Sequence, residues 1–488
     1  MKNEPTKLSK VNVQISQAPI KKANVIDIWA LGVTLVFALI VFYTIFIPPL
    51  GTKTSTDFGR VMDFFNLYYQ PGEMDWGSFH NVFNTNRPLD FSHYGGYFAS
   101  ASIFVALGFI PNYVVRFFTP DSQDLYYIVC LGAMYFTVYV LAFYFFISVV
   151  SKQIKNKLTF LILSLFMVWA LSDLLFVEYF NSFFQEPAFI VGLLLFAAVF
   201  LRFNSFTLDL LAYGIIIFSK EQNLIFILLA IPIFIKHRIN LSKIVSFILI
   251  TLLVIAISTK VDTYQKVMNN ENGVLSGILH NKSESEAKDI LTKLGLDPEL
   301  SVLAGRDFWG NIGLVRQNPQ DFNLTTQFEN AKSIGRLETV KGYIYFPKQF
   351  IINYHDFIQI CSKDGPFVPS NYVYNDDGSL VASYASYFSN GVLKHIGIII
   401  LINLLVVIVI PFLYKAKSAT LGNLTFKNEM VLFYILNILA LIIIPVNFVG
   451  DGFAETVKHT LNLYFLEAIN LSLLLYILSA IFISKNSK

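Results

Sequence analysis

Long apolar runs separated by short polar loops dominate this chain. A helix needs about 20 apolar residues to cross a bilayer, and most of the runs reach that length. Two shorter runs fit a helical hairpin that breaks at 219–222. The pattern therefore predicts ten membrane-spanning helices, at 26–49, 125–150, 158–177, 187–203, 206–219, 222–236, 242–259, 394–414, 429–449 and 461–484.

Basic residues in the loops predict the orientation of these helices. Lys21 and Lys22 precede the first span, and Lys155 follows the second. Positive charge favours the cytoplasmic side. Both groups of lysines can lie on that side only if segment 96–118 does not cross the membrane and instead lies along the outer surface as a juxtamembrane helix. The later basic loops then also lie inside, together with both termini: Arg202, Lys236, His237, Arg238, Lys415, Lys417, Lys485 and Lys488.

Two long segments fall on the outer side of this topology, 50–124 and 260–393. The second has ordinary mixed polarity and is long enough for a small folded domain. We therefore expect an N-terminal membrane module over 1–259, an extracytoplasmic loop domain over 260–393 and a C-terminal membrane module over 394–488. The predicted fold class is an all-α polytopic membrane protein.

Composition supports the membrane class. Of 488 residues, 55% are hydrophobic and 14% are charged, and the mean hydropathy is +0.57, which excludes an ordinary water-soluble globule. The net charge of +3 is too small to indicate a nucleic-acid partner. Cys130 and Cys361 cannot build a disulfide framework, and zinc-binding spacings are absent. The first apolar run lacks a small-residue cleavage pattern and predicts an anchor rather than a signal peptide.

Most candidate reactive side chains fall on the outer side. The first cluster, DFGRVMDFF, follows the first span and contains Asp57, Arg60 and Asp63. Residues three apart share one helical face, so Asp57 and Arg60 predict a local ion pair on a surface helix. The same pair would also suit a general base at the membrane surface, with Arg60 orienting it or binding phosphate.

A second cluster, LSDLLFVEYFNSFFQEP, carries acidic residues at the ends of two spans. Acidic side chains within a membrane helix are costly and are by default functional candidates. Glu186, which precedes Pro187, also suits a helix N-terminus. We predict that Asp173, Glu178, Asn181 and Glu186 bind substrate.

The third cluster, FSKEQN, places Lys220 on the outer side, against the charge bias. A lysine at a helix end often extends its ammonium to the interface. Beside Gln222 and Asn223, however, it suits an anionic headgroup.

The fourth cluster, GDGFAETVKHT, precedes the last span. Gly450 and Gly452 permit close backbone approach, and Asp451, Lys458 and His459 bring both charge signs into one short loop. A solvated turn would explain the same residues. The aromatic and polar stretches 294–310 and 354–378 form a fifth cluster that would suit a sugar-binding surface.

The motifs DFGRVM, EYFNSFFQEP, SKEQN, LGLDPELSVLAG and GDGFAETVKH occur in this order along the chain. On them the chain resembles the GT-C superfamily of integral-membrane glycosyltransferases, and more narrowly the bacterial hexosyltransferases of S-layer and wall-glycan clusters (the WsfD type). The resemblance implies a polyprenyl-phosphate hexose donor, an extracytoplasmic glycan or cell-wall polymer as acceptor, and inversion at the anomeric carbon. It implies that Asp57 is the catalytic base, on the extracytoplasmic face of a bacterial plasma membrane.

Polyprenyl phosphate is a good leaving group, so this reaction needs no nucleotide. It needs no metal cofactor if cationic side chains neutralise the departing phosphate, although a divalent metal is not excluded. Lys220, with Arg60, Lys458 or His459, would hold that phosphate.

Two other functions remain open. A glycan polymerase or ligase of the Wzy or O-antigen-ligase kind more typically centres on arginines and a histidine in its outer loops, whereas Arg306, Arg316 and Arg336 are scattered here. A transporter predicts internal repeats and charged or broken helices at the bilayer midplane, whereas these charges cluster at the outer boundary.

Overall fold

The computed structural model describes residues 27–52, 56–69, 79–85, 98–119, 124–258, 263–364, 387–421, 427–454 and 456–483. Over these ranges the chain is mostly helical, as predicted. The described residues contain one sheet, in which β1 (Val82–Asn84) pairs antiparallel with β2 (Leu125–Tyr127).

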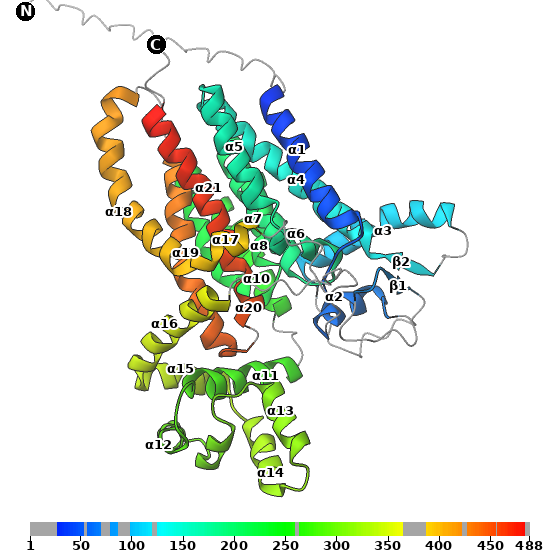
Figure 1. Ribbon diagram of the computed structural model, residues 1–488, viewed down its shortest axis with the longest axis vertical. Helices are drawn as coiled ribbons and strands as arrows, with labels where there is room; N and C mark the ends of the chain where they lie inside the picture. Colours follow the sequence, from blue (N-terminus) through cyan, green and yellow to red (C-terminus); the bar gives the residue numbers. More distant parts are fainter. Residues whose placement is uncertain are drawn as a thin grey trace, which may run out of the picture.

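A bundle of apolar helices forms the larger part of the molecule (Figure 1). Within it α4 packs against α1 and α7, and α19 packs against α21. Figure 1 places the start of α1 and the end of α21 at the same end of the bundle, as expected for an even number of crossings. The bundle helices are α1 (Ile28–Phe46), α4 (Ile128–Gln153), α5 (Lys157–Leu171), α7 (Glu186–Arg202), α8 (Phe206–Ile217), α10 (Leu241–Ser258), α18 (Ile396–Leu421), α19 (Lys427–Asp451) and α21 (Leu461–Ile483).

Short helical elements interrupt this bundle. Helix α5 is followed by α6 (Leu174–Val177) and η4 (Glu178–Asn181), with a bend of 49° between them. After α8 the chain continues as η5 (Glu221–Leu229) and α9 (Ala230–Lys236). These breaks lie where the sequence places its polar clusters.

Six helices of the described residues are long and apolar enough to cross a membrane, and the bent α5–η4 pair makes a possible seventh. The chain is therefore a multi-span membrane protein, but the predicted number of ten spans is not confirmed. One reason is length: α7 and α8 have 17 and 12 residues, fewer than the roughly 20 that a bilayer requires. The six are Ile28–Phe46, Ser100–Phe118, Ile128–Gln153, Tyr387–Leu413, Lys427–Asp451 and Leu461–Phe482.

Helix α3 (Ser100–Phe118) covers the segment that the charge rule places on the outer surface. Figure 1 shows it running across the bundle axis, close to the end of α1. Ile110, Tyr113 and Phe117 are 64%, 74% and 75% exposed, and such apolar side chains suit the boundary between headgroups and acyl chains. Its direction agrees with the predicted juxtamembrane helix, whereas its length and composition alone would also suit a span.

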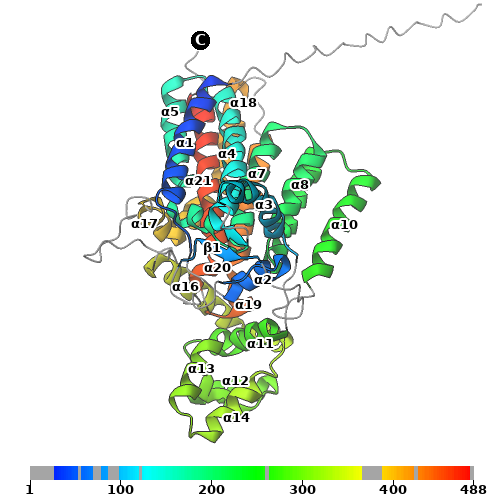
Figure 2. The ribbon, with the colours of Figure 1, turned by 90° about the vertical axis from the view of Figure 1, so that its right-hand side faces the viewer.

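A smaller helical lobe lies beyond the end of the bundle opposite the start of α1 (Figures 1 and 2). Ser283 and Glu286 form a capping box at the start of α12, and Asp307 accepts the amide of Gly310 at 2.6 Å at the start of α13. The lobe falls within the segment 260–393. Its elements are α11 (Thr263–Asn272), η6 (Gly273–Ile278), α12 (Glu284–Leu294), η7 (Pro298–Leu303), α13 (Phe308–Gln317), α14 (Phe322–Ala331), α15 (Arg336–Tyr345) and α16 (Pro347–Asp364).

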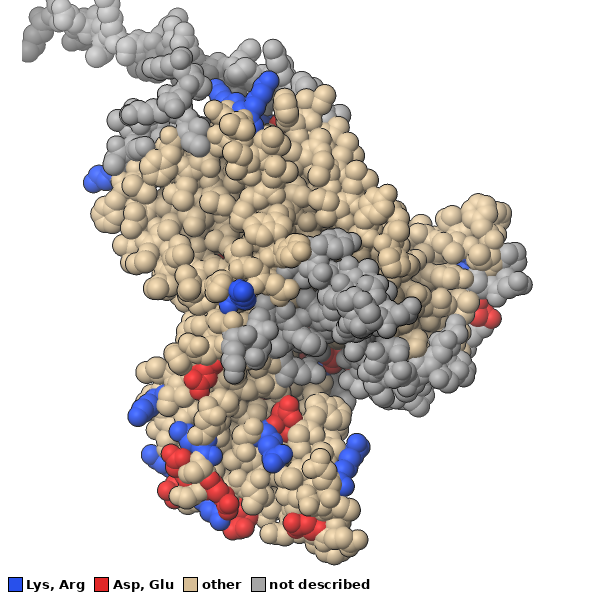
Figure 3. Space-filling view, in the orientation of Figure 1, with Lys and Arg blue, Asp and Glu red and all other residues tan. Residues whose placement is uncertain are grey.

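The distribution of charged residues also separates the bundle from the lobe. Figure 3 shows a broad uncharged face over the bundle, basic residues at its upper end and both charge signs over the lobe.

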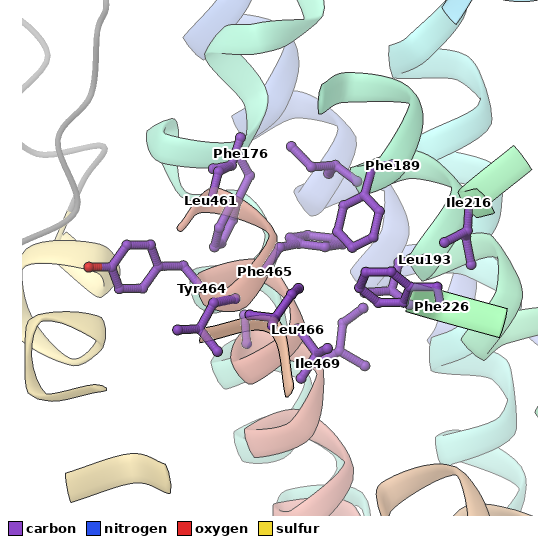
Figure 4. Packing of buried hydrophobic residues seen from close by; sticks show 14 of the residues in the cluster. Phe176, Phe189, Leu193, Ile216, Phe226, Leu461, Tyr464, Phe465, Leu466 and Ile469 are labelled. Atoms are coloured by element: carbon purple, nitrogen blue, oxygen red, sulfur yellow. The ribbon is translucent and has the colours of Figure 1, made fainter. Parts of the chain in front are cut away.

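Inside the bundle, Phe176 packs edge-on against Phe465 at 4.9 Å between ring centroids, and Phe189 against Phe226 at 4.8 Å (Figure 4). These contacts join α6 to α21 and α7 to η5, and so fix the broken helices that carry polar residues.

Candidate functional site

A polar pocket lies where the lobe meets the bundle. Its volume is about 530 Å³, including the part open to solvent. Four distant parts of the chain contribute: the segment after α1, the break between α8 and η5, helices α11 and α13 of the lobe, and the turn after α19. The lining residues are Asp57, Arg60, Lys220, Glu221, Gln222, Gln265, Met268, Asn269, Asn272, Trp309, Asp451, Ala454 and His459.

Asp57 and Arg60 lie on three short helical turns after α1, namely η1 (Thr56–Phe58), α2 (Gly59–Met62) and η2 (Asp63–Phe65). The predicted ion pair is present, with Arg60 Nη2 2.9 Å from Asp57 Oδ1 and both side chains 17% exposed. Arg60 Nη2 also donates to Gln265 Oε1 at 2.5 Å. The pair is therefore held against the lobe, and its carboxylate lines the pocket.

Lys220 also lines the pocket, but its charge is compensated. Its Nζ lies 3.0 Å from Glu186 Oε1, with the two side chains only 8% and 5% exposed. Glu186 begins α7, and Lys220 immediately precedes η5. Gln222, two residues further on, lines the pocket as well. An anion at Lys220 would thus share the ammonium with a buried carboxylate.

Asp451 joins the bundle to the lobe. Its Oδ1 accepts from Asn272 Nδ2 at 2.7 Å, and its Oδ2 lies 2.9 Å from His459 Nε2. Asn272 in turn accepts the amide of Phe308 at 2.7 Å. His459 ends α20 (Thr456–His459). The side chain of Lys458 lies outside the described residues.

The turn after α19 passes very close to η6. Gly452 has φ of +59°, and a Cβ at this position would collide with Asn272 O and Ser276 Oγ. Ser276 Oγ also accepts the amide of Phe453 at 3.1 Å. The close backbone approach predicted from the glycines is confirmed at Gly452. The element beneath it, η6, is a π-helix, a form that often occurs at functional sites.

Asp173 does not line the pocket. Its Oδ1 accepts the amide of Leu175 at 3.0 Å, which caps α6, and its Oδ2 accepts the amide of Ser389 in α17 (Tyr387–Gly391) at 2.9 Å. Glu178 is fully buried in η4 and does not line the pocket either. The carboxylate of Asp173 thus satisfies backbone groups where helices break.

Asn181 also lies outside the pocket lining. Its Nδ2 donates to Ile45 O at 2.8 Å and to Leu50 O at 2.7 Å, and the side chain is 1% exposed. These two bonds fasten the end of α1 to η4. The geometry gives Asn181 a role in positioning the segment that leads to Asp57.

Helix α11 of the lobe supplies pocket residues that the sequence clusters did not include. Gln265, Asn269 and Asn272 lie on it at spacings of four and three, and Trp309, which belongs to the fifth sequence cluster, joins them from α13. Gln265 Nε2 donates to Asn269 Oδ1 at 2.8 Å. A stripe of amides at helical spacing was the available signal, because residues three and four apart share one face. Glu221 lies in the third sequence cluster, but no role was predicted for it.

Glu271 lies on the same helix but contacts the lobe interior. It is fully buried, and Asn311 Nδ2 donates to its Oε1 at 2.8 Å. Burial raises the pKa of Glu271 to about 7, against the lowering effect of the Asn311 bond. Among the described residues, no group of three or more His, Cys, Asp or Glu side chains is arranged to hold a metal ion.

Comparison with known proteins gives one family. The model of the YfdI N-terminal transmembrane domain matches residues 14–488, almost the whole chain. No curated protein and no solved structure matches the chain.

Proposed function

The chain belongs to the YfdI N-terminal transmembrane domain family, and we propose that it is a membrane glycosyltransferase of the GT-C type. It would move a hexose from a polyprenyl-phosphate donor to an extracytoplasmic glycan or cell-wall polymer. One observation carries the proposal: a single pocket at the lobe end of the bundle gathers Asp57, Lys220 and Asp451, with their neighbours, from three separate motifs. The family match supports the membrane part of the proposal, since its model is that of a transmembrane domain.

The reaction needs a base that faces solvent. The acceptor hydroxyl oxygen attacks the anomeric carbon from the side opposite the phosphate, while the bond from that carbon to the phosphate oxygen breaks. The hydroxyl proton passes to the Asp57 carboxylate, and polyprenyl phosphate leaves with the electron pair. Asp57 suits this task because it lines the pocket and remains 17% exposed, so that an acceptor can reach it.

The Asp57–Arg60 pair also couples proton transfer to the leaving group. Before reaction, Arg60 is balanced by the carboxylate 2.9 Å away. Once Asp57 takes the proton it becomes neutral, and the guanidinium charge is then available to the phosphate at the moment when negative charge develops there. A cation whose field strengthens in the transition state lowers the barrier more than one that binds the ground state equally well.

Lys220 would add a second positive charge. An ammonium has three N–H donors, and Glu186 takes one of them at 3.0 Å. Glu186 therefore holds the Lys220 ammonium at the pocket wall, and this bond does not use the other N–H donors of the ammonium. In this proposal Glu186 positions Lys220 and does not bind a sugar hydroxyl.

The test uses purified protein in liposomes with a polyprenyl-phosphate hexose as donor. Asp57→Asn should lower kcat by about 10²–10⁴ without raising donor KM, because this carboxylate meets the acceptor and its loss leaves the Arg60 guanidinium available to the donor phosphate. Asp289→Asn, an exposed carboxylate on α12, is the matched control and should behave as wild type. Full activity of Asp57→Asn would refute the assigned base.

The donor that the protein uses in this assay distinguishes a glycosyltransferase from a polymerase or ligase and from a transporter. Transfer from the monophosphate donor supports the glycosyltransferase. Activity only with a diphosphate-linked oligosaccharide would instead indicate a polymerase or ligase. Movement of the lipid-linked sugar across the bilayer with no new glycosidic bond would indicate a transporter.

A further inference from the structure

A second cavity, of about 650 Å³ including open solvent, lies at the other end of the bundle. Helix α19 connects the two sites, since Lys427 at its start lines this cavity and Asp451 at its end lines the candidate site. At 1.5 Å per residue, the 25 residues of α19 span roughly 36 Å. The two sites are therefore separated by about the thickness of a membrane.

The lining of this cavity is basic. The described residues that line it include Arg202 at the end of α7, Lys236 at the end of α9 and Lys427, and no carboxylate. Of these three cations, Lys236 alone has a close counter-charge within the described ranges, with Nζ 2.8 Å from Asp209 Oδ2. Asp209 also lies 2.7 Å from His237 Nε2. Within the part of the chain that the structure describes, the charges of Arg202 and Lys427 are therefore in excess.

Lys236 lines the cavity, but its ammonium donates to protein acceptors rather than to a ligand. Besides Asp209, its ammonium donates to Phe200 O and Phe203 O, both at 2.6 Å, so its three N–H groups are used. These carbonyls belong to the last turn of α7, which carries the negative end of the helix dipole. Because Lys236 donates to these carbonyls, it compensates the negative end of the α7 dipole, which would otherwise repel an anion.

Arg202 is held in place by aromatic rings. Its Cζ lies 5.5 Å, 5.2 Å and 5.4 Å from the ring centroids of Tyr144, Phe145 and Phe203, so three aromatic faces orient the guanidinium. In the described part of the chain, no atom accepts a hydrogen bond from its buried Nη1. A buried donor without an acceptor is costly, and an anionic oxygen would remove that cost.

We propose that this cavity binds a phosphate-bearing anion, namely the headgroup of an acidic phospholipid in the leaflet at that end of the bundle. Arg202 would bind a phosphate oxygen through its planar fork. Lys427 and the first amides of α19 would add charge and the positive end of a helix dipole. Basic pockets between membrane helices are known to select acidic lipids. The proposal is independent of the proposed function, because no pocket residue of the candidate site takes part.

Native mass spectrometry of the full chain tests the proposal. Protein from nanodiscs of phosphatidylcholine with phosphatidylglycerol should retain phosphatidylglycerol in preference. Arg202→Gln and Lys427→Gln should each lower that retention about ten-fold, the loss expected for one charged hydrogen bond. Lys427 is exposed, so its variant should fold even if Arg202→Gln does not. Lys155→Gln, an exposed lysine that does not line the cavity, is the control.

A second arm identifies the source of the phosphate. If inorganic phosphate raises the Tm of wild type but not of Lys427→Gln, and phosphatidylglycerol does not bind, the site takes a soluble anion and the lipid assignment is wrong. Equal phosphatidylglycerol retention by wild type and Lys427→Gln, with no effect of inorganic phosphate, would overturn the anion site itself. A loss in Lys155→Gln as large as in Lys427→Gln would overturn it too, because it would reduce the effect to overall charge.

Discussion

Replacing Lys220 alone should destabilise the protein, because its partner is buried. The Nζ–Oε1 distance to Glu186 is 3.0 Å, and the side chains are 8% and 5% exposed. Lys220→Met removes the ammonium that pairs with the Glu186 carboxylate, which is only 5% exposed. Removing one partner of a buried ion pair typically costs about 3–5 kcal/mol.

That cost can be converted into a thermal shift. Unfolding entropy is about 2.1 cal/mol/K per residue, or about 1 kcal/mol/K for a chain of 488 residues. Lys220→Met should therefore lower Tm by roughly 3–5 °C. The double variant Glu186→Gln/Lys220→Met removes both charges and should recover most of the loss, because replacing a whole buried pair is often close to neutral.

The assay is thermal unfolding of the purified protein in detergent, followed by intrinsic fluorescence. The control pair is Lys332 and Glu329, whose Nζ–Oε1 distance of 2.8 Å is similar but whose side chains are 34% and 61% exposed. Lys332→Met should change Tm by less than about 1 °C, since exposed pairs contribute little. If the Tm loss of the double variant equalled the sum of the losses of Lys220→Met and Glu186→Gln made singly, the pair would not be coupled and this reasoning would fail.

The same double variant separates folding from phosphate binding. With the fold recovered, it should still show a raised donor KM if the Lys220 ammonium contacts the phosphate. Wild-type KM would limit Lys220 to a structural role and leave Arg60 as the phosphate ligand.

Three further predictions concern one residue of the lobe, one of its junction with the bundle and one inside the bundle. Burial raises the pKa of Glu271 from the ordinary 4.5 to about 7. The contribution of the protonated carboxyl to the free energy of unfolding is therefore complete below pH 4.5 and is lost as the pH rises through 7. At about 1.4 kcal/mol per pH unit, the loss amounts to roughly 3 kcal/mol. Glu271→Gln should flatten the fall in Tm between pH 5 and pH 7.5, and an unchanged slope would contradict the assignment. Gly452→Ala should lower both Tm and activity, because the added Cβ meets Ser276 Oγ and Asn272 O at a positive φ, and a wild-type Tm would show that this turn relaxes without cost. Asn181→Ala removes the side-chain donor to Leu50 O and one of two donors to Ile45 O, which still accepts the amide of Leu50. The change should cost about 1–3 kcal/mol while donor KM per folded molecule stays unchanged; a large rise in KM would restore its predicted role as a substrate ligand.

Much of the architecture follows from the sequence because it depends on local or averaged properties. Apolar runs predict membrane helices, since each must satisfy its own backbone within the bilayer. The Asp57–Arg60 pair is local, so its spacing of three predicts the contact that forms. The breaks between apolar runs also indicate where polar residues gather, and a single pocket does collect residues from three such breaks.

The partners and roles of the remaining polar residues were decided by tertiary packing. Lys220 and Glu186 are 34 positions apart, and their pairing depends on how α7 lies against η5, which no spacing encodes. The amides of α11 enter the pocket only because the lobe folds back onto the bundle. Asn181 and Asp173 resembled ligand-binding residues because a helix break in an apolar core needs buried polar side chains in either case. Whether such a side chain serves a substrate or a backbone carbonyl depends on which atoms lie within about 3 Å of it, and only the folded chain fixes that distance.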